Sequence, residues 1–445
     1  MIKVAVVTLG CAKNQVDSEY ILGVLQNNQF EIVNDLNKAA LVIVNTCSFI
    51  TAAKQEALDT IMGLVQLERR PYIIVAGCLA QQHARELWSE LPEVAAFITP
   101  AAIGRLPTII KRVIAGERLL DIPPGDSGPG VLPRLSRESV PYAYLKIAEG
   151  CNNRCSFCTI PLIKGPYRSR PMESVVAEAR ALLANGVKEL ILVAQDTTAY
   201  GIDCYGEYRL PQLLKQLARL PELKWLRILY SYPTRITPEL VEVMATEAKV
   251  LPYLDLPLQH ASPRIIKLMQ RGDSAEIALK AIERLRRAMP EIALRSTFIV
   301  GFPGEREADY QELLDFLAAI KFDWVGAFKY SPEAGTRAAY LPDQVPDELK
   351  DERYHRLMEQ QQAITRACNG RWLGRELPVI METSTIGRSF RQAPEVDGLI
   401  YLEGSTLPPG SMAALKMVRV HENYDLIARL PERDNAAVTA LPGNS

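Results

Sequence analysis

The sequence predicts an α/β protein in three parts: an N-terminal doubly wound α/β domain, a central open (β/α)6 barrel and a small C-terminal antiparallel β-barrel. The first two parts alternate short apolar runs with amphipathic stretches, which is typical of parallel sheets covered by helices. The last part has short strand-like runs separated by Gly, Pro and Ser. A third observation, three cysteines directly after the first strand of the central part, indicates where the chemistry takes place.

The N-terminal domain is predicted to span residues 1–118, and three cysteines, Cys11, Cys47 and Cys78, each follow one of its strands. Because the carboxyl ends of parallel strands meet at one edge of a doubly wound sheet, these thiols should converge and could bind a metal cluster. The alternative is that each is a small buried apolar side chain. The expected strands are 3–8, 41–45 and 72–77, and the expected helices are 17–26, 51–68 and 80–91.

A linker over 119–139 should follow, because residues 123–130 are all Pro, Gly, Ser or Asp. From 140 to 368 a strand-then-helix unit occurs about six times. Six units are too few for a closed eight-stranded barrel, so we expect an open barrel with its chemistry at the carboxyl ends of the strands. The expected strands lie near 142–147, 189–193, 225–230, 253–256, 293–300 and 324–330, and the expected helices near 173–184, 210–220, 238–247, 275–289, 307–320 and 347–367.

The loop after the first barrel strand carries Cys151, Cys155 and Cys158, with three and then two residues between them. Three thiolates can ligate three irons of a [4Fe–4S] cluster, and no fourth cysteine follows within the next forty residues. The fourth iron would be open to a small molecule, which indicates a catalytic cluster. The alternative, a structural zinc site, would need a fourth Cys or His at short spacing.

This CxxxCxxC spacing, with the aromatic Phe157 before the last cysteine, resembles the signature of radical S-adenosylmethionine (SAM) enzymes. The resemblance implies that the open iron binds SAM and that the reduced cluster cleaves it to a 5'-deoxyadenosyl radical. Because side chains alternate along a strand, only one of Arg295 and Ser296 should face the barrel lumen. The candidates for holding SAM, besides Phe157, are Gln195, Asp196, Arg295, Ser296, Gly301 and Gly304, the two glycines being explained nearly as well by an ordinary strand-to-helix turn.

Residues 370–435 are predicted to form the small C-terminal barrel, with strands near 377–381, 398–402, 414–420 and 425–428. Between residues 376 and 430, seven acidic side chains exceed five basic ones, a net charge of −2. This balance favours a basic protein partner over a phosphate backbone. The whole chain has 51 Lys and Arg against 52 Asp and Glu, which excludes binding of a polyanion by bulk charge.

The composition also limits the cellular compartment of the protein and the kinds of metal or catalytic site that it can have. The chain has no signal-peptide layout and no run of eighteen apolar residues, so we expect a cytoplasmic protein without a membrane span and with reduced thiols. Four histidines argue against a histidine–metal site, and no catalytic side chain is predicted beyond the cluster ligands. His260 is expected to be satisfied by the backbone, and Cys204 and Cys368 are treated as thiols without a role.

Over nearly its full length the chain resembles the methylthiotransferases, which join a three-cysteine domain, a radical SAM barrel and a TRAM domain. Residues 8–19 (TLGCAKNQVDSE) and 195–201 (QDTTAYG) resemble the ribosomal-protein branch, RimO. The resemblance implies two [4Fe–4S] clusters, on Cys11, Cys47 and Cys78 and on the CxxxCxxC cysteines, and SAM as both methyl donor and radical source. It implies methylthiolation of the β-carbon of an aspartate in the decoding-centre ribosomal protein, number twelve of the small subunit.

The expected partners follow from the same resemblance. They are the ribosomal protein and a reductant protein such as a flavodoxin or ferredoxin, with no membrane and no tRNA. Two alternatives stay open at this point. One is a tRNA adenosine methylthiotransferase, and the other is a non-enzymatic iron–sulfur sensor that binds RNA.

Overall fold

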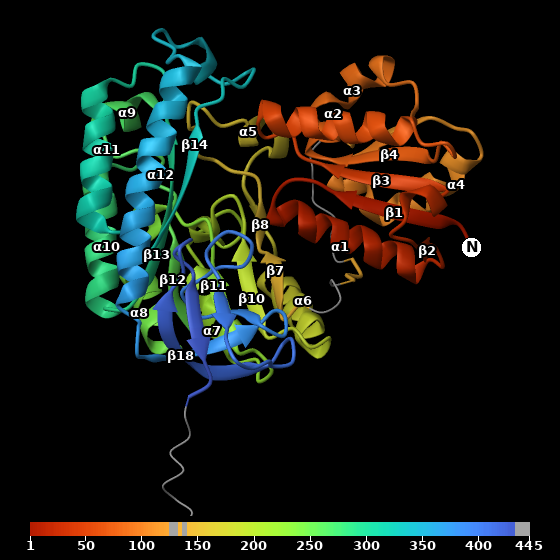
Figure 1. Ribbon diagram of the computed structural model, residues 1–445. Helices are drawn as coiled ribbons and strands as arrows, with labels where there is room; N and C mark the ends of the chain where they lie inside the picture. Colours follow the sequence, from red (N-terminus) through yellow and green to blue (C-terminus); the bar gives the residue numbers. More distant parts are fainter. Residues whose placement is uncertain (124–131, 136–139, 432–445) are drawn as a thin grey trace, which may run out of the picture.

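The computed structural model describes residues 1–123, 132–135 and 140–431. Across these residues the chain forms two parallel sheets covered by helices and a small closed barrel (Figure 1). The predicted fold class is therefore confirmed. Most of the predicted linker and the last residues of the predicted C-terminal domain, 432–435, lie outside the described residues. Among the described helices, none has the length and apolar character needed to cross a membrane.

Within residues 1–123, six parallel strands form the first sheet in the order β2-β1-β3-β4-β5-β6. Helices α1 and α4 pack on one face and α2 and α3 on the other, so the domain is doubly wound. The strands are β1 (Lys3–Thr8), β2 (Glu31–Ile32), β3 (Leu41–Thr46), β4 (Tyr72–Gly77), β5 (Val94–Ile98) and β6 (Leu119–Asp121), and the helices are α1 (Ala12–Asn27), α2 (Thr51–Val65), α3 (Cys78–Glu90) and α4 (Leu106–Ile114).

Two boundaries of this domain differ from the prediction. Strand β6 lies in the stretch predicted as the start of the linker, because a three-residue edge strand is too short to show a period. Helix α1 begins at Ala12 rather than near Asp17, since its first turn is polar and gives no apolar periodicity. Cys11 therefore occupies the N-cap position of α1 instead of lying in a longer loop.

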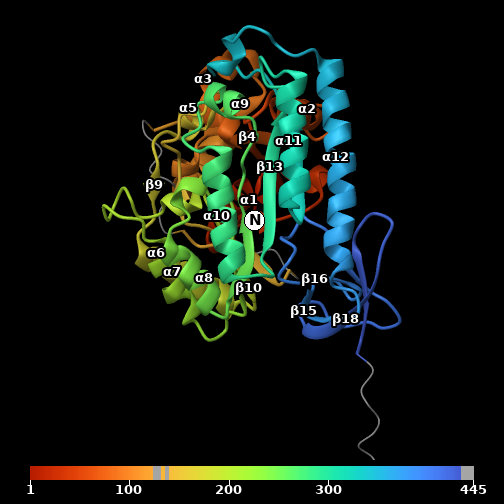
Figure 2. The same cartoon turned by 90° about the vertical axis from the view of Figure 1, so that its left-hand side faces the viewer.

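Within residues 140–431, six parallel strands form the second sheet in the order β14-β13-β12-β11-β10-β7. The sheet does not close between β14 and β7, and helices cover its outer face (Figure 2). The strands are β7 (Tyr142–Lys146), β10 (Glu189–Val193), β11 (Trp225–Ile228), β12 (Val250–Asp255), β13 (Ala293–Val300) and β14 (Trp324–Lys329), and the covering helices are α6 (Met172–Ala184), α7 (Leu210–Ala218), α8 (Pro238–Thr246), α10 (Ala275–Ala288), α11 (Glu307–Ile320) and α12 (Asp347–Gly370).

Short elements lie at the carboxyl end of this open barrel, where the cysteine loop is. Strands β8 (Ala148–Glu149) and β9 (Arg168–Ser169) pair and enclose the loop, which continues into α5 (Ile160–Lys164). Helix α9 (Pro263–Leu268) follows β12. Three short 3-10 helices, η3 (Thr197–Ala199), η4 (Pro233–Arg235) and η5 (Ala338–Tyr340), follow β10, β11 and β14.

The C-terminal strands described up to residue 431 close into a barrel in the order β15-β16-β17-β19-β18 around an apolar core. All pairs are antiparallel except β17 with β19, which is parallel. The sequence did not predict β16, because three residues that include Gly387 show no alternation. The strands are β15 (Glu376–Met381), β16 (Ile386–Arg388), β17 (Ile400–Leu402), β18 (Met412–Val420) and β19 (Leu426–Arg429).

Residues 388–397, at and after the end of β16, pack against the amino-terminal end of the central barrel. Arg388 and Arg227 both bind Glu189, at 2.9 and 2.7 Å, and all three side chains are buried. Tyr253 donates a hydrogen bond to Asp397 at 2.6 Å. Arg388, Asp397 and the likewise buried Arg391 face the central barrel instead of solvent, so the charge count made from the sequence includes three side chains that are not on this domain's surface. The other charged residues between 376 and 430 are six acidic and three basic, so the domain stays net acidic as predicted.

Candidate functional site

The cysteine loop is fixed on both sides by backbone hydrogen bonds. The Cys151 amide donates to the Gly165 carbonyl at 3.2 Å. Gly165 lies in the segment that connects α5 to β9. The Ser156 amide donates to the carbonyl of Met269, just after α9, at 2.8 Å. Because both anchors belong to the carboxyl end of the barrel, the loop holds Cys151, Cys155 and Cys158 at the barrel mouth.

These three thiols resist ionisation in the absence of a cation. Burial raises the pKa of Cys151 to about 11 and that of Cys158 to about 12. Burial also raises the pKa of Cys155, although Arg271 opposes the shift. The neighbouring thiolates add to the cost at Cys158. Since thiolates are the form that ligates iron, a positively charged metal centre would supply the missing stabilisation.

The cysteines of the first domain lie at the corresponding sheet edge. Cys11 caps α1, Cys47 directly follows β3, and Cys78 is the first residue of α3. Burial raises the pKa of Cys78 to about 12, and negative charge on Cys47 and Cys11 contributes to that shift, so the three thiols share one neighbourhood. Gly10 has φ +94°, and a Cβ built there would lie 2.6 Å from Cys47 Cβ, so the close approach of the two loops requires glycine.

In the described part of the chain, no group of three or more His, Cys, Asp or Glu side chains is arranged to hold one metal ion. In a [4Fe–4S] cluster each thiolate binds a different iron, so its sulfur ligands lie further apart than those of one zinc ion.

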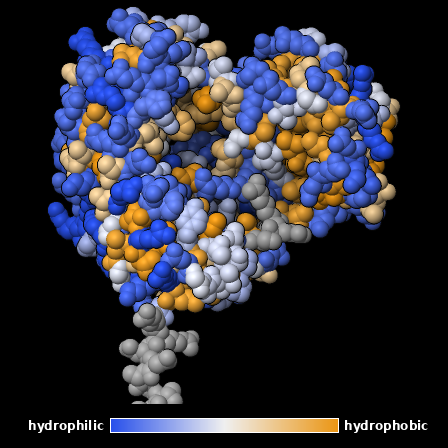
Figure 3. Space-filling view, in the orientation of Figure 1, coloured by the Kyte–Doolittle hydropathy of each residue, from blue (hydrophilic) through white to orange (hydrophobic). Residues whose placement is uncertain are grey.

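The two cysteine sets lie next to each other. Helix α5, which continues the cysteine loop, packs against α3, which begins at Cys78. Thr159 Oγ1 donates to the Phe49 carbonyl at 3.3 Å, which joins the cysteine loop to the loop that follows Cys47. The surface is hollowed between the central barrel and the first domain (Figure 3). These contacts bring the two cysteine-bearing regions together at the interface between the first domain and the central barrel.

Gln195 and Asp196 follow β10 beside the cysteine loop. Asp196 accepts hydrogen bonds from Arg235 at 2.5 Å and from Asn153 of the cysteine loop at 3.1 Å. Gln195 donates to Glu149 at 3.1 Å, while its buried Oε1 has no hydrogen-bond partner in the described structure. A buried acceptor without a partner is costly, so Gln195 Oε1 fits an ammonium or hydroxyl donor of a bound molecule such as SAM.

On β13, Arg295 and Ser296 point in opposite directions. Arg295 faces the lumen and binds Asp255 at 3.0 Å and Asp397 at 3.2 Å. Ser296 faces away, and its hydroxyl donates to the Leu256 carbonyl at 2.9 Å. Each side chain thus already has protein partners, and contact of either with SAM stays a prediction.

The remaining predicted SAM residues have local explanations. Gly301 has φ +71°, and a Cβ there would lie 2.2 Å from Lys350 Cγ of α12, so backbone shape and packing already require glycine. Gly304 also has a positive φ, +78°. Phe157 packs edge-on against Phe302, with ring centroids 6.4 Å apart. The structure therefore neither adds nor removes a role for these three residues in binding SAM.

His260 is buried, and its Nδ1 accepts the Ser262 amide at 3.0 Å, in agreement with the backbone role expected for it. Its Nε2 lies 3.4 Å from Glu305. Cys204 is exposed, Cys368 is buried, and neither belongs to the two cysteine sets.

A buried charge network between the domains was missed by the sequence analysis. Lys146, the last residue of β7, binds Asp17 of α1 at 2.5 Å and Glu149 at 2.8 Å. Lys164, at the end of α5, lies 3.4 Å from Glu149. All four side chains are buried, and Lys164 and Glu149 also lie near Cys78. The signal in the sequence was weak, because an acidic residue on a helix usually faces solvent.

Three regions of the chain match known protein families. Residues 145–317 match the radical SAM superfamily, residues 3–99 match the uncharacterized protein family UPF0004, and residues 373–430 match the TRAM domain. These regions coincide with the open barrel, the first sheet and the C-terminal barrel.

Whole-length relatives narrow the family further. The chain is 64% identical over 430 residues to "Ribosomal protein uS12 methylthiotransferase RimO" of Moorella thermoacetica, covering 97% of this chain and 100% of that protein. The chain belongs to the RimO family. Proteins of the same name from Heliobacterium modesticaldum and a Synechococcus species are 44% and 46% identical, over 96% of this chain and 94% and 91% of theirs.

Membership of the RimO family confirms two predictions made from the sequence. The chain is a radical SAM methylthiotransferase, and the tRNA branch and the non-enzymatic sensor are not favoured. The radical SAM superfamily implies one [4Fe–4S] cluster and SAM, and the CxxxCxxC loop lies inside the matched region.

Solved structures agree with this RimO assignment at the level of the fold. The radical SAM methyltransferase TsrM from Kitasatospora setae aligns with a TM-score of 0.56 and 17% identity over 76% of this chain and 77% of that chain. The cobalamin-dependent SAM radical enzyme OxsB aligns with a TM-score of 0.53 and 15% identity over 82% and 56%. At these identities the likeness concerns the fold alone.

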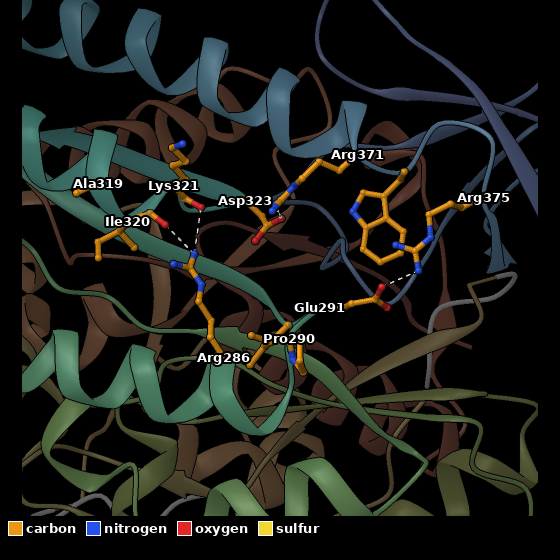
Figure 4. Close-up of a pocket in the computed structure, with 11 residues that line it drawn as sticks. Arg286, Pro290, Glu291, Ala319, Ile320, Lys321, Asp323, Arg371 and Arg375 are labelled. Carbon is orange, nitrogen blue, oxygen red and sulfur yellow. Dashed lines mark hydrogen bonds and ion pairs between the residues drawn. The ribbon is translucent and has the colours of Figure 1, made fainter.

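A separate cavity of about 420 Å³ lies at the opposite end of the RimO-type barrel, beside the C-terminal domain (Figure 4). Two of its basic side chains have partners within the protein. Arg286 donates to the Ile320 carbonyl at 2.7 Å, and Arg375 binds Glu291 at 2.6 Å. Because this cavity is lined by residues that precede β13 and β14, it is not part of the cysteine sites.

Proposed function

We propose that this chain transfers a methylthio group to the β-carbon of an aspartate in ribosomal protein uS12. The observation that carries the proposal is that the elements bearing the two three-cysteine sets touch across the interface between the first domain and the barrel. The name of the relatives, shared at up to 64% identity over the whole chain, supports uS12 as the substrate. A substrate segment that enters the cleft between these two domains would meet both sets of thiols.

We assign one [4Fe–4S] cluster to Cys151, Cys155 and Cys158 and a second to Cys11, Cys47 and Cys78. When bound and reduced, the first cluster with SAM supplies a radical that takes hydrogen from an unactivated carbon, and the second offers a separate place to hold sulfur. SAM also supplies the methyl group, and a flavodoxin or ferredoxin is a suitable electron donor.

The chain's own residues orient these groups. Asn153 ties the cysteine loop to Asp196, which Arg235 holds in turn, so the loop keeps its position relative to β10. Gln195 Oε1 is the acceptor that we assign to the amino group of SAM. Lys146, between Asp17 and Glu149, fixes the first domain against the barrel and thereby the distance between the two thiol sets.

Anaerobic reconstitution of the full chain tests this function. The protein is incubated with SAM, a reductant and either purified uS12 or tRNA, and the products are analysed by mass spectrometry. We expect uS12 to gain the mass of one methylthio group at an aspartate and tRNA to stay unmodified. Modification of tRNA with unmodified uS12 would overturn the substrate while leaving the chemistry in place.

A further inference from the structure

Lys13 lies on the cleft between the two domains. It belongs to the first turn of α1, two residues after Cys11. Its Nζ lies 3.9 Å from the centroid of the Tyr230 ring, which belongs to the chain that follows β11. A single side chain of the first domain thus reaches the carboxyl end of the barrel, beside the cysteines that we assign to the second cluster.

In the described part of the chain, the Nζ of Lys13 has no hydrogen bond and no ion pair within 4.0 Å, and it lies over the face of Tyr230. The negative groups that act on its charge, Glu149, Cys11 and Cys78, lie further away. Three other cations of this region have close acidic partners. These pairs are Lys146 with Asp17 and Glu149, Arg235 with Asp196, and Arg271 with Asp273.

The Tyr230 ring is held in place beneath Lys13. Tyr230 has φ +59°, a left-handed conformation that is costly for a residue with a large side chain. Its amide donates to Asp255 at 3.0 Å, and its carbonyl accepts the Thr197 amide at 3.0 Å, so both neighbouring strand ends maintain the strained backbone. Such strain is typical of sites where one side chain must be presented in a fixed direction.

An ammonium over an aromatic face uses one side for the ring and keeps its remaining N–H donors for another acceptor. An anionic oxygen is the acceptor that such a group binds best, because a charge-assisted hydrogen bond is stronger than a neutral one. In the aspartate of the proposed substrate, the carboxylate is attached directly to the carbon that reacts. A cation at this position would hold that carboxylate and keep the β-carbon inside the cleft.

We propose that Lys13, presented by Tyr230, is the binding site for the side-chain carboxylate of the substrate aspartate. The inference rests on the proposed function and makes it more specific, because it names the group that selects aspartate over its neutral analogue, asparagine. Lys13 is here a substrate-binding residue and has no part in ligating iron.

The test is a double-mutant comparison between enzyme and substrate. Reconstituted full-length enzyme, wild type, Lys13→Met or Lys13→Arg, is titrated with uS12 carrying either the target aspartate or Asn in its place. Binding is measured by isothermal titration calorimetry with SAM and without reductant. Lys111→Met, an exposed lysine on α4 of the same domain, is the matched control.

We expect the wild type to bind the aspartate form at least about tenfold more tightly than the Asn form, and Lys13→Met to remove that preference while Lys13→Arg keeps most of it. Lys111→Met should behave as the wild type. Iron content and circular dichroism spectra of the variants establish that they fold and load equally.

If Lys13→Met weakened both forms by the same factor, or kept the wild-type preference, Lys13 would be a structural residue and the inference would be overturned. A lower iron content in Lys13→Met would overturn it as well, because the charge of Lys13 would then be needed to retain the cluster and not to bind substrate. If the wild type neither bound nor modified uS12, the proposed function would fail instead. The two failures are therefore distinguishable.

Discussion

The chain builds its two three-cysteine sites in different ways. Cys151, Cys155 and Cys158 lie in one loop of eight residues, whereas Cys11, Cys47 and Cys78 come from three strand ends that are 36 and 31 residues apart. The cysteines of the first site are close together in sequence and their loop is anchored to Gly165 and Met269, but the second site depends on the parallel register of β1, β3 and β4. A site within one loop can be recognised from the sequence spacing of its cysteines. A site assembled from several strand ends can be recognised only from the fold that brings those strand ends together.

The largest effect is expected at the local site. Changing Cys151, Cys155 and Cys158 together to Ala should reduce iron from about eight per chain to about four, since one of two clusters loses its ligands. Reductive cleavage of SAM should be abolished. Iron analysis and chromatography of 5'-deoxyadenosine measure both results, and Cys204→Ala serves as the control. Unchanged iron in the triple variant would contradict the assignment of this loop.

The assembled site should affect a different step. Replacing Cys11, Cys47 and Cys78 with Ala should abolish methylthio transfer, because the sulfur loses its holder, while SAM cleavage continues at the intact loop. Mass spectrometry of uS12 and assay of 5'-deoxyadenosine in the same reaction separate the two outcomes. Normal product formation by this variant would show that the N-terminal thiols are structural. SAM cleavage and methylthio transfer would then not be assigned to separate cysteine sites.

The comparison also explains what could be predicted from the sequence. The cysteine loop and the alternation of strands and helices are local patterns, so they were available without a structure. The contact of Asp17 with Lys146 joins residues far apart in the chain, and only the docking of two domains creates it. The same holds for Arg388 with Glu189, which takes one basic side chain of the C-terminal domain out of solvent and into the domain interface. Free acceptors such as Gln195 Oε1 likewise become visible only when every partner is placed.

A smaller effect is expected where the two sites are joined. Asp17→Asn removes the negative charge that Lys146 meets in the buried domain interface, and Glu149 stays as its remaining partner. We expect a loss of about 2 kcal/mol in the free energy of unfolding, the scale of a hydrogen bond to a charged group. Urea unfolding of the apoprotein measures it, with the exposed Asp59→Asn on α2 as control. Equal stability of the two variants would mean that the network does not fasten the domains.

The smallest effect concerns one side chain at the local site. Gln195→Leu keeps the approximate volume but removes the buried Oε1 that has no protein partner, so SAM should bind about tenfold more weakly. The same change also removes the bond to Glu149, but Glu149 keeps its contacts with Lys146 and Lys164, so folding and iron content should not change. Calorimetric titration of the reconstituted protein with SAM measures the affinity, and Gln311→Leu on the outer helix α11 is the matched control. Wild-type affinity in Gln195→Leu would show that the amino group of SAM is bound elsewhere. The loop cysteines would then locate the cluster without locating the cofactor's contacts, because those contacts come from neighbouring strand ends and depend on assembly in the same way as the N-terminal site.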